Sequence, residues 1–175
     1  MKVNAYAVNE PKGKLEPFSY ELGKLSPENI DIKVSYCGVC HSDIHMMNNE
    51  WGMTQYPIVP GHEIIGEIVA AGNAVKNLKV GDIVGLGWMS SSCMSCSECM
   101  SGDHNLCSNS EGTIIGRHGG FAEYVRSHWS WAIPIPKGMD LSKTGPLLCG
   151  GITVFSPLFS SNIKPTDSVG VIGIG

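Results

Sequence analysis

Short apolar runs, broken by glycine, proline and polar turn residues, fill the first 90 residues of the chain. Runs rich in β-branched and aromatic residues and bounded by turn residues are typical of β-strands. One of them, EIIGEIVAAG, is apolar at nearly every position, so we expect it to be buried on both faces of a sheet. The pattern predicts an all-β barrel with tight corners, whose strands cover 3–8, 18–22, 30–37, 63–72 and 82–87.

The pattern changes at two places in the middle of the chain. HSDIHMMN (41–48) predicts a short helix that begins beside Cys40 or Ser42. Residues 90–110 are rich in cysteine, serine and methionine and have no periodicity, which indicates a lobe held by something other than a hydrophobic core. The 119–136 segment then returns to a strand pattern.

The last third of the chain predicts helix followed by strand. Residues 141–161 favour one or two helices with a break at a Gly-Gly pair, and SVGVIGIG (168–175) is β-rich. A strand that leads into Gly-x-Gly-x-x-Gly begins a dinucleotide-binding unit, because the glycines let the backbone approach a pyrophosphate. Only Gly173 and Gly175 of that motif are present, so the run predicts the first strand of a truncated cofactor domain.

Composition narrows the class of protein. With 175 residues, 42% hydrophobic and 16% charged, the chain is long enough to bury one core. A net charge of -4 and a pI near 5.8 argue against nucleic-acid binding. No apolar stretch approaches the roughly 20 residues that span a bilayer, and the polar start MKVNAYAVNE is not a signal peptide. We therefore expect a cytoplasmic protein without membrane or nucleic-acid partners.

Four of the seven cysteines form a compact motif. CMSCSECMSGDHNLC has the spacing C-x2-C-x2-C-x7-C, and four thiolates make a closed tetrahedral zinc site. An iron–sulfur cluster is a competing interpretation, but the x7 spacing and the lack of a proline after the last cysteine favour zinc. A pair of disulfides is the third alternative. The motif predicts a structural zinc ion held by Cys93, Cys96, Cys99 and Cys107.

Three further stretches, CGVCHSDIH (37–45), GHE (61–63) and LLCGG (147–151), are weak signals when taken alone. A lone histidine or cysteine is more often a packing residue than a ligand. Together with YPIVPGHEIIGEI, GDIVG, the cysteine lobe, GGFAEY, PLLCGGITVFSPL and VGVIGIG, they occur in the order found in one enzyme family. The chain resembles the zinc-dependent medium-chain alcohol dehydrogenases over nearly its whole length, and their cinnamyl-alcohol-dehydrogenase-like branch most closely.

The resemblance implies a particular domain organisation. Residues 1–150 would form a GroES-like, partly open barrel, mainly β with short helices, and carry the structural zinc lobe at 90–110. Residues 151–175 would hold the connecting helix and the first strand of a truncated Rossmann domain. The chain would then be the amino-terminal half of a longer protein. This half is expected to be inactive alone and to expose apolar surface, and the full-length protein is expected to be a homodimer.

A second zinc ion follows from the same resemblance. Cys40, His62 and Cys149 match the catalytic ligands, the Cys2His set known for alcohol dehydrogenase, which leaves a fourth position open for water or alcohol. Zinc there stabilises the alkoxide of a bound alcohol and so favours hydride transfer to a nicotinamide ring. Glu63 matches a neighbouring carboxylate that serves as an occasional fourth ligand, with a salt bridge as the plainer alternative.

The resemblance also assigns the residues around that zinc. Asp43 would steady the metal-bound histidine, or be no more than an acid at a helix start. Ser42 and His45 would form a proton relay, in which the hydroxyl takes the proton of the alcohol and the imidazole passes it to solvent. Each of these residues would otherwise be a polar helix residue that faces water.

Cofactor and substrate contacts come from the same comparison of motifs. His41, Gly173 and Gly175 would bind the cofactor, with His41 beside the pyrophosphate. Trp51 and Trp88 match wall positions of the substrate pocket, where two indoles would favour planar or slender aldehydes; core packing is the alternative. NADP(H) is expected rather than NAD(H), by analogy with the branch, since the deciding residues lie beyond Gly175.

The leading functional hypothesis is a zinc-dependent, nicotinamide-linked alcohol dehydrogenase or aldehyde reductase that acts on small primary alcohols and aldehydes. A zinc-stabilised GroES-like binding module without catalysis is the main alternative, although a pure module would have no use for an open metal site. A polyol dehydrogenase is the nearest rival within the enzyme class, but many of those lack the lobe cysteines. A zinc-ribbon nucleic-acid binder is disfavoured by the acidic charge.

Overall fold

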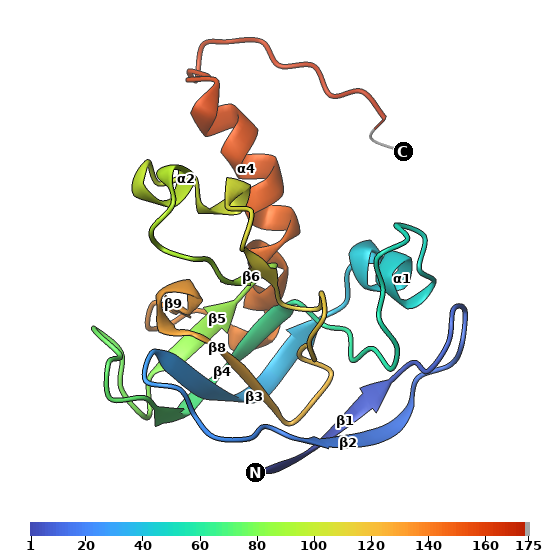
Figure 1. Cartoon of the computed structure of the whole chain (residues 1–175). Helices are drawn as coiled ribbons and strands as arrows, with labels where there is room; N and C mark the ends of the chain where they lie inside the picture. The colour runs from blue at the N-terminus through green and yellow to red at the C-terminus, as the bar shows by residue number, and fades with distance from the viewer. Residues whose placement is uncertain (174–175) are drawn as a thin grey trace.

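The computed structural model describes residues 1–173, and its centre is a five-stranded antiparallel sheet in the order β8-β3-β4-β5-β9 (Figure 1). The sheet does not close on itself, as expected for a partly open barrel. Its strands are β3 (Asn29–Gly38), β4 (Glu63–Ala71), β5 (Ile83–Leu86), β8 (Tyr124–His128) and β9 (Ile133–Pro134). The mainly β prediction is confirmed.

Smaller elements surround this sheet. A hairpin of β1 (Lys2–Ala7) and β2 (Glu16–Glu21) lies along one side, and a second small pair joins β6 (Met89–Ser91) to β7 (Glu111–Gly112). The helices are short: α1 (His41–Met47), α2 (Ser97–Met100), α3 (Leu141–Thr144) and α4 (Gly150–Ser160), with 3-10 turns at His104–Leu106, Trp129–Trp131 and Gly145–Leu148. Among residues 1–173, no helix is long and apolar enough to cross a membrane.

The main core lies where β3, β4 and β5 pack their branched side chains together. The predicted 63–72 strand runs from Glu63 to Ala71, and its first four residues and Ile68 are buried. Glu67 is the exception, because its side chain reaches solvent between them. Burying an isoleucine stabilises the fold by about 1.5–3 kcal/mol. The buried cluster consists of Ile30, Ile32, Ile64, Ile68, Val84, Leu86, Val125 and Ala132. It therefore anchors β4, the strand that begins directly after His62.

A buried ion pair ties the sheet to the loop after β2. Arg126 Nε donates to Asp31 Oδ1 at 2.7 Å, and both side chains are largely buried. The same guanidinium donates to the carbonyls of Leu22 and Lys24 at 2.7 and 2.8 Å. Because Asp31 lies on β3 and the two carbonyls lie in the loop after β2, one arginine holds the β2–β3 connection against the sheet.

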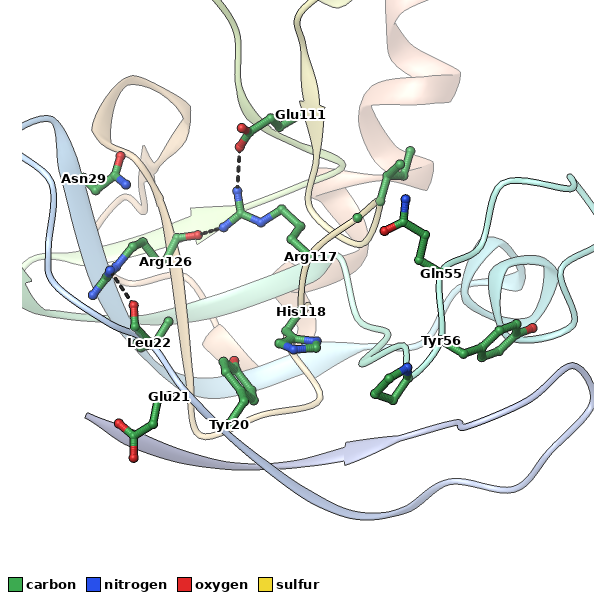
Figure 2. Close-up of a pocket in the computed structure, with 13 residues that line it drawn as sticks. Tyr20, Glu21, Leu22, Asn29, Gln55, Tyr56, Glu111, Arg117, His118 and Arg126 are labelled. Carbon is green, nitrogen blue, oxygen red and sulfur yellow. Dashed lines mark hydrogen bonds and ion pairs between the residues drawn. The ribbon is translucent and has the colours of Figure 1, made fainter.

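The cysteine-rich lobe joins the sheet through a second arginine. Arg117 Nη1 donates to Ser90 Oγ at 2.6 Å and forms an ion pair with Glu111, while Nη2 donates to the backbone carbonyl of Arg126 (Figure 2). Within the lobe, α2 and the turn at His104–Leu106 are too short to bury a core of their own. The prediction of a lobe without a hydrophobic core is consistent with this arrangement.

The end of the described chain departs from the prediction. Helix α4 extends away from the sheet, and five of its apolar side chains are exposed: Ile152, Val154, Phe155, Leu158 and Phe159 (Figure 1). The exposed apolar surface expected from the sequence is therefore present. Residues 168–173 form no strand, because no neighbouring strand within the described part of the chain offers backbone hydrogen bonds to this run. Gly175 lies outside the described residues.

Candidate metal centres and the adjoining cavity

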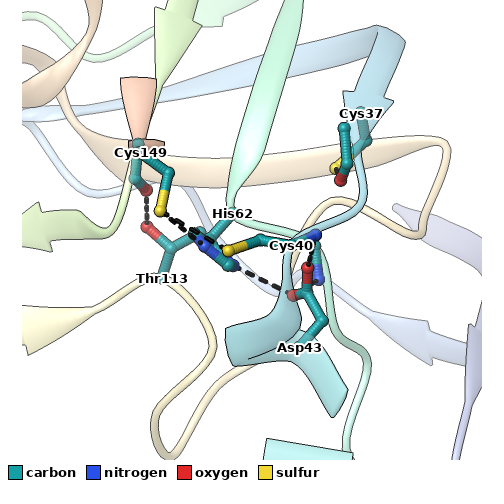
Figure 3. A network of polar contacts seen from close by, with 9 residues as sticks. Cys37, Cys40, Asp43, His62, Thr113 and Cys149 are labelled. Carbon is teal, nitrogen blue, oxygen red and sulfur yellow. Dashed lines mark hydrogen bonds and ion pairs between the residues drawn. The ribbon is translucent and has the colours of Figure 1, made fainter. Parts of the chain in front are cut away.

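Three segments that are distant in sequence meet at Cys40, His62 and Cys149 (Figure 3). Cys40 is the N-cap of α1, His62 directly precedes β4, and Cys149 lies between the Gly145–Leu148 turn and α4. The Sγ atoms of the two cysteines are 3.7 Å apart, and His62 Nε2 is 3.3 Å from Cys149 Sγ. The residues expected to share one ion are thus neighbours in space.

These distances fit a tetrahedral zinc ion. With Zn–S bonds of about 2.3 Å and tetrahedral angles, two thiolates stand about 3.8 Å apart, and a thiolate and an imidazole nitrogen about 3.6 Å apart. The cysteine pair matches the first value closely, and the histidine–cysteine pair is slightly tighter. The donor set of two thiolates and one imidazole is also one that zinc prefers. The geometry therefore suits zinc, and a disulfide is not formed between any of the seven cysteines.

Asp43 orients the histidine of this centre. Its Oδ1 accepts hydrogen bonds from His62 Nδ1 at 2.9 Å and from the Gly61 N–H at 2.8 Å, and its Oδ2 accepts from the Cys40 N–H at 2.9 Å. Burial disfavours the charged imidazole, but the hydrogen bond and charge of Asp43 outweigh burial and raise the pKa of His62. With Nδ1–H directed at Asp43, the Nε2 lone pair points toward the cysteines.

Glu63 completes the cluster from a buried position. Its carboxylate belongs to the group of four side chains whose ligand atoms lie within 4.8 Å of one another. Burial raises the pKa of Glu63. Room for the carboxylate comes from Gly38, where an added Cβ would lie 2.0 Å from Glu63 Oε2. Sequence reasoning missed Gly38, because its requirement arises from a neighbouring strand rather than from any local motif.

The two thiols of this centre differ in acidity. Burial raises the pKa of Cys40, but hydrogen bonds from Ser42 and its other neighbours outweigh burial and lower that pKa overall. Burial and the adjacent Cys40 thiolate raise the pKa of Cys149 to about 12. Cys40 therefore loses its proton more readily than Cys149, and a dication bound to both thiolates would displace the protons that remain.

The lobe forms a separate cluster of four cysteines, Cys93, Cys96, Cys99 and Cys107, whose sulfur atoms lie within 4.8 Å of one another. Cys93 Sγ and Cys99 Sγ are 3.9 Å apart, close to the edge of a zinc tetrathiolate. Backbone N–H groups of Ser95 and Cys96 lower the pKa of Cys93 to about 6. Four protein donors fill a tetrahedral shell, so this cluster suits a closed structural ion and leaves no position for substrate.

A cavity of about 310 Å³ adjoins the Cys40–His62–Cys149 centre. Ser42 and Cys149 line it together with both tryptophans named in the sequence analysis, and the Trp51 and Trp88 rings meet edge to face with centroids 6.0 Å apart. Trp88 also contacts the His62 ring edge to face at 5.0 Å. The structure further adds Leu148, Ile152 and Thr153 to the lining, which sequence reasoning had not singled out.

Outside this cavity, α1 presents two more of the expected site residues. His45 stacks on Trp51, and its Nδ1 contacts the carboxylate of Glu50, a residue that the sequence analysis did not single out. His41 is exposed, and its ring lies 4.6 Å from that of His45. Gly173, expected at the cofactor, is exposed with φ of 78° and follows α4 along the chain.

A second cavity, of about 580 Å³, lies on the other side of the sheet between β2 and the segment around Arg117 (Figure 2). Its two arginines are engaged with protein acceptors, as described above, and one wall carries His118 and Tyr20 with ring centroids 4.2 Å apart. None of the cysteines lines it. The metal centre and its smaller cavity therefore remain the candidate for chemistry.

The fold and the two centres place the chain in the medium-chain alcohol dehydrogenase class. Residues 26–137 match the family model described as the alcohol dehydrogenase GroES-like domain, and the chain belongs to this family. It is 54% identical over 173 residues to the aldehyde reductase AdhA of Synechocystis sp., a match that covers 99% of this chain and 52% of that protein. A probable cinnamyl alcohol dehydrogenase of Pinus taeda is 40% identical, with 99% and 51% covered.

Solved structures give the same result. A cinnamyl alcohol dehydrogenase of Sorghum bicolor superimposes with a TM-score of 0.94 at 33% identity, covering all of this chain and 52% of that one. The cinnamyl alcohol dehydrogenase of Helicobacter pylori, complexed with NADP(H), also gives a TM-score of 0.94 at 33% identity, covering 100% and 53%. The chain spans about half the length of the curated relatives that it matches.

Proposed function

We propose that this chain is the zinc- and substrate-binding part of a zinc-dependent, nicotinamide-linked alcohol dehydrogenase or aldehyde reductase. The observation that supports this function most directly is the convergence of Cys40, His62 and Cys149 at zinc-like distances beside a cavity. The similarity to an aldehyde reductase and to cinnamyl alcohol dehydrogenases supports the same function.

In this proposal Cys40, His62 and Cys149 hold a zinc ion, and the residues around it have separate roles. When bound, zinc would supply a Lewis acid that polarises the oxygen of an alcohol or aldehyde. Asp43 holds the His62 ring in the tautomer that leaves Nε2 available. The buried Glu63 carboxylate lies within 4.8 Å of the other ligand atoms. When ionised, it can balance the charge of a dication while substrate and water exchange.

Ser42 and His45 carry the proton in this proposal. Ser42 lines the cavity, so its hydroxyl is available to an alcohol bound there. His45 is on the same face of α1, three residues later, and 32% of its side chain is exposed to solvent. A hydroxyl in the cavity and an imidazole at the surface can pass a proton outward to solvent.

The cavity walls favour a narrow substrate. Two indole rings that meet edge to face border a cavity of about 310 Å³, and Leu148 and Ile152 add aliphatic surface to its lining. Such a cavity suits primary alcohols and aldehydes that are planar or slender, since branched substrates would collide with the rings. Extra hydroxyl groups of a polyol would lose hydrogen bonds wherever they lie against the indoles, Leu148 or Ile152.

The proposed function also includes a cofactor, an oligomeric state and a location in the cell. We propose NADP(H) as the nicotinamide cofactor, a preference supported by the NADP(H) complex of the Helicobacter pylori relative, with His41 as one contact to its pyrophosphate. We also propose Gly173 and Gly175 as cofactor residues, two zinc ions per chain, a homodimer of the whole protein and a cytoplasmic location.

Metal analysis and a cobalt spectrum test the proposal. The chain should contain two zinc ions; Cys40→Ser should remove one and Cys107→Ser the other. When Co²⁺ replaces zinc in the Cys107→Ser variant, an added primary alcohol or aldehyde should change its visible absorption, because the ligand enters the coordination shell. Zinc content without any spectral response would leave a zinc-stabilised binding module, and that result would overturn the enzymatic proposal.

A further inference from the structure

Two histidines on α1 lie in an arrangement that suits metal chelation, apart from both cysteine centres. His41 and His45 are four residues apart on the helix, so their side chains rise from the same face. Their ring centroids are 4.6 Å apart, with an interplanar angle of 63°. Paired histidines at this helical spacing are a recurrent way to hold a transition metal ion.

The His45 ring is held in place before any metal binds. Its Nδ1 contacts Glu50 Oε2, while Glu50 Oε1 accepts a hydrogen bond from Asn48 Nδ2 at 2.8 Å. On one side the ring also stacks on Trp51, with centroids 5.1 Å apart. When Nδ1–H is directed at a carboxylate, the lone pair remains on Nε2. In this tautomer Nε2 can bind a metal ion.

A local turn creates this support. The Glu50 N–H donates to the His45 carbonyl at 3.0 Å, and Asn49 adopts a left-handed conformation with φ of 55°. The chain therefore folds back at the end of α1 and brings Glu50 to the helix face that carries the histidines. Asp43 and His62 show the same relationship of carboxylate to imidazole at the buried centre, so α1 contributes one partner to each of two carboxylate–imidazole pairs.

The His41 ring is the accessible half of the pair. Among residues 1–173, no hydrogen bond holds its ring nitrogens, and the residue is exposed. One ring is thus fixed and the other can rotate about its side-chain torsions to meet a shared ion. Water would occupy the remaining coordination positions, because the pair supplies only two donors.

From this arrangement we infer that His41 and His45 form a third metal site, open to solvent, which binds divalent transition ions with Glu50 as the orienting carboxylate. Imidazole pairs prefer Cu²⁺, Ni²⁺ and Zn²⁺ over Mn²⁺ and Mg²⁺, and affinity follows the usual order for first-row metals. If the proposed function holds, an ion here would cover the cofactor contact and the surface end of the proton path. Metal binding itself does not depend on that function.

Calorimetric titration with Ni²⁺ tests the inference, using the whole chain with its cysteine centres already loaded with zinc. The expected result is one Ni²⁺ per chain. Loss of a ligand in His41→Ala or His45→Ala should weaken binding by more than about tenfold, and Glu50→Gln, which removes only the orienting charge, by about tenfold. His128→Gln, a histidine on β8, is the matched control and should bind Ni²⁺ as the parent chain does.

Paramagnetic broadening locates the ion in the same samples. Ni²⁺ should broaden the NMR resonances of α1 selectively, while zinc content and the rest of the spectrum remain unchanged, which also shows that each variant is folded. Absence of Ni²⁺ binding, or binding that survives both His41→Ala and His45→Ala, would overturn the inference. Neither outcome affects the zinc and cobalt measurements that test the proposed function.

Discussion

Asp43 and His62 form the hydrogen bond on which the buried centre depends: the carboxylate Oδ1 and the imidazole Nδ1 are 2.9 Å apart, and neither side chain is more than 1% exposed. The same carboxylate accepts the N–H groups of Cys40 and Gly61. One side chain therefore fixes the backbone at one ligand and the ring orientation at another. This makes Asp43 the residue whose change should affect zinc most without removing a ligand.

Asp43→Asn should weaken zinc binding at the Cys40–His62–Cys149 centre by about 10–100-fold. An amide has a single acceptor oxygen, so its NH2 group would face either the Cys40 N–H or both the His62 Nδ1–H and the Gly61 N–H, and at least one donor would lose its partner. Competition with a zinc chelator measures the change. The lobe zinc should be unaffected, and Asp140→Asn, at a helix cap where both residues serve equally, is the control. Equal affinity in the Asp43→Asn variant and the parent would contradict this role.

Ser42→Ala tests the proton path in a protein that contains this chain together with its cofactor-binding part. Loss of the cavity hydroxyl should lower kcat by about 100-fold or more, because no other side chain replaces the proton acceptor. Zinc content should remain at the parent level, since Ser42 is not a ligand. Ser161→Ala, at the exposed end of α4, serves as the matched control. Unchanged turnover in Ser42→Ala would reject the relay.

Gly38→Ala should destabilise the fold by about 1–3 kcal/mol or more. The new Cβ would lie 2.0 Å from Glu63 Oε2 and 3.0 Å from Glu63 Cβ, and the buried carboxylate has little room to move. Urea unfolding of the zinc-loaded chain measures the change. Gly150→Ala is the control: nothing lies within 4 Å of its Cβ position, so it should be neutral or slightly stabilising. A Gly38→Ala variant as stable as Gly150→Ala would refute the crowding argument.

Because of His118, the free energy of unfolding should depend on pH. Burial and the nearby Arg117 charge lower the pKa of His118 in the folded state. Below about pH 6.5 the unfolded chain therefore binds a proton that the folded chain does not, and the free energy of unfolding falls with acidification. His118→Phe, which keeps the ring contacts with Tyr20 and Phe18, should remove this component. The difference in free energy of unfolding between parent and variant, measured by urea unfolding, should be constant above neutral pH and change below it. A difference that stays constant at every pH would contradict the role of His118.

The sequence predicted most strands because apolar runs report burial directly, as at Ile64, Ile65 and Ile68. The four lobe cysteines were predicted as ligands from their spacing, whereas Cys40, His62 and Cys149 came from the family resemblance; the structure brings each set together. Glu50 and Gly38 could not be named. The first depends on a left-handed turn at Asn49, and the second on the approach of Glu63 from a neighbouring strand. The strand predicted in 168–175 is not formed over the described residues 168–173 for a related reason: strand formation requires a partner, and a local pattern does not supply one.

Arg126→Met tests the buried ion pair that joins the sheet to the loop after β2. The substitution leaves Asp31 as a buried carboxylate without its cation, and such a change lowers the free energy of unfolding by about 3–5 kcal/mol. The carbonyls of Leu22 and Lys24 also lose their donor. In the double variant Asp31→Leu/Arg126→Met no orphan charge remains, so part of the loss should be recovered. Urea unfolding of the two variants gives the comparison. A double variant less stable than Arg126→Met would mean that the charge of Asp31 is balanced by another group.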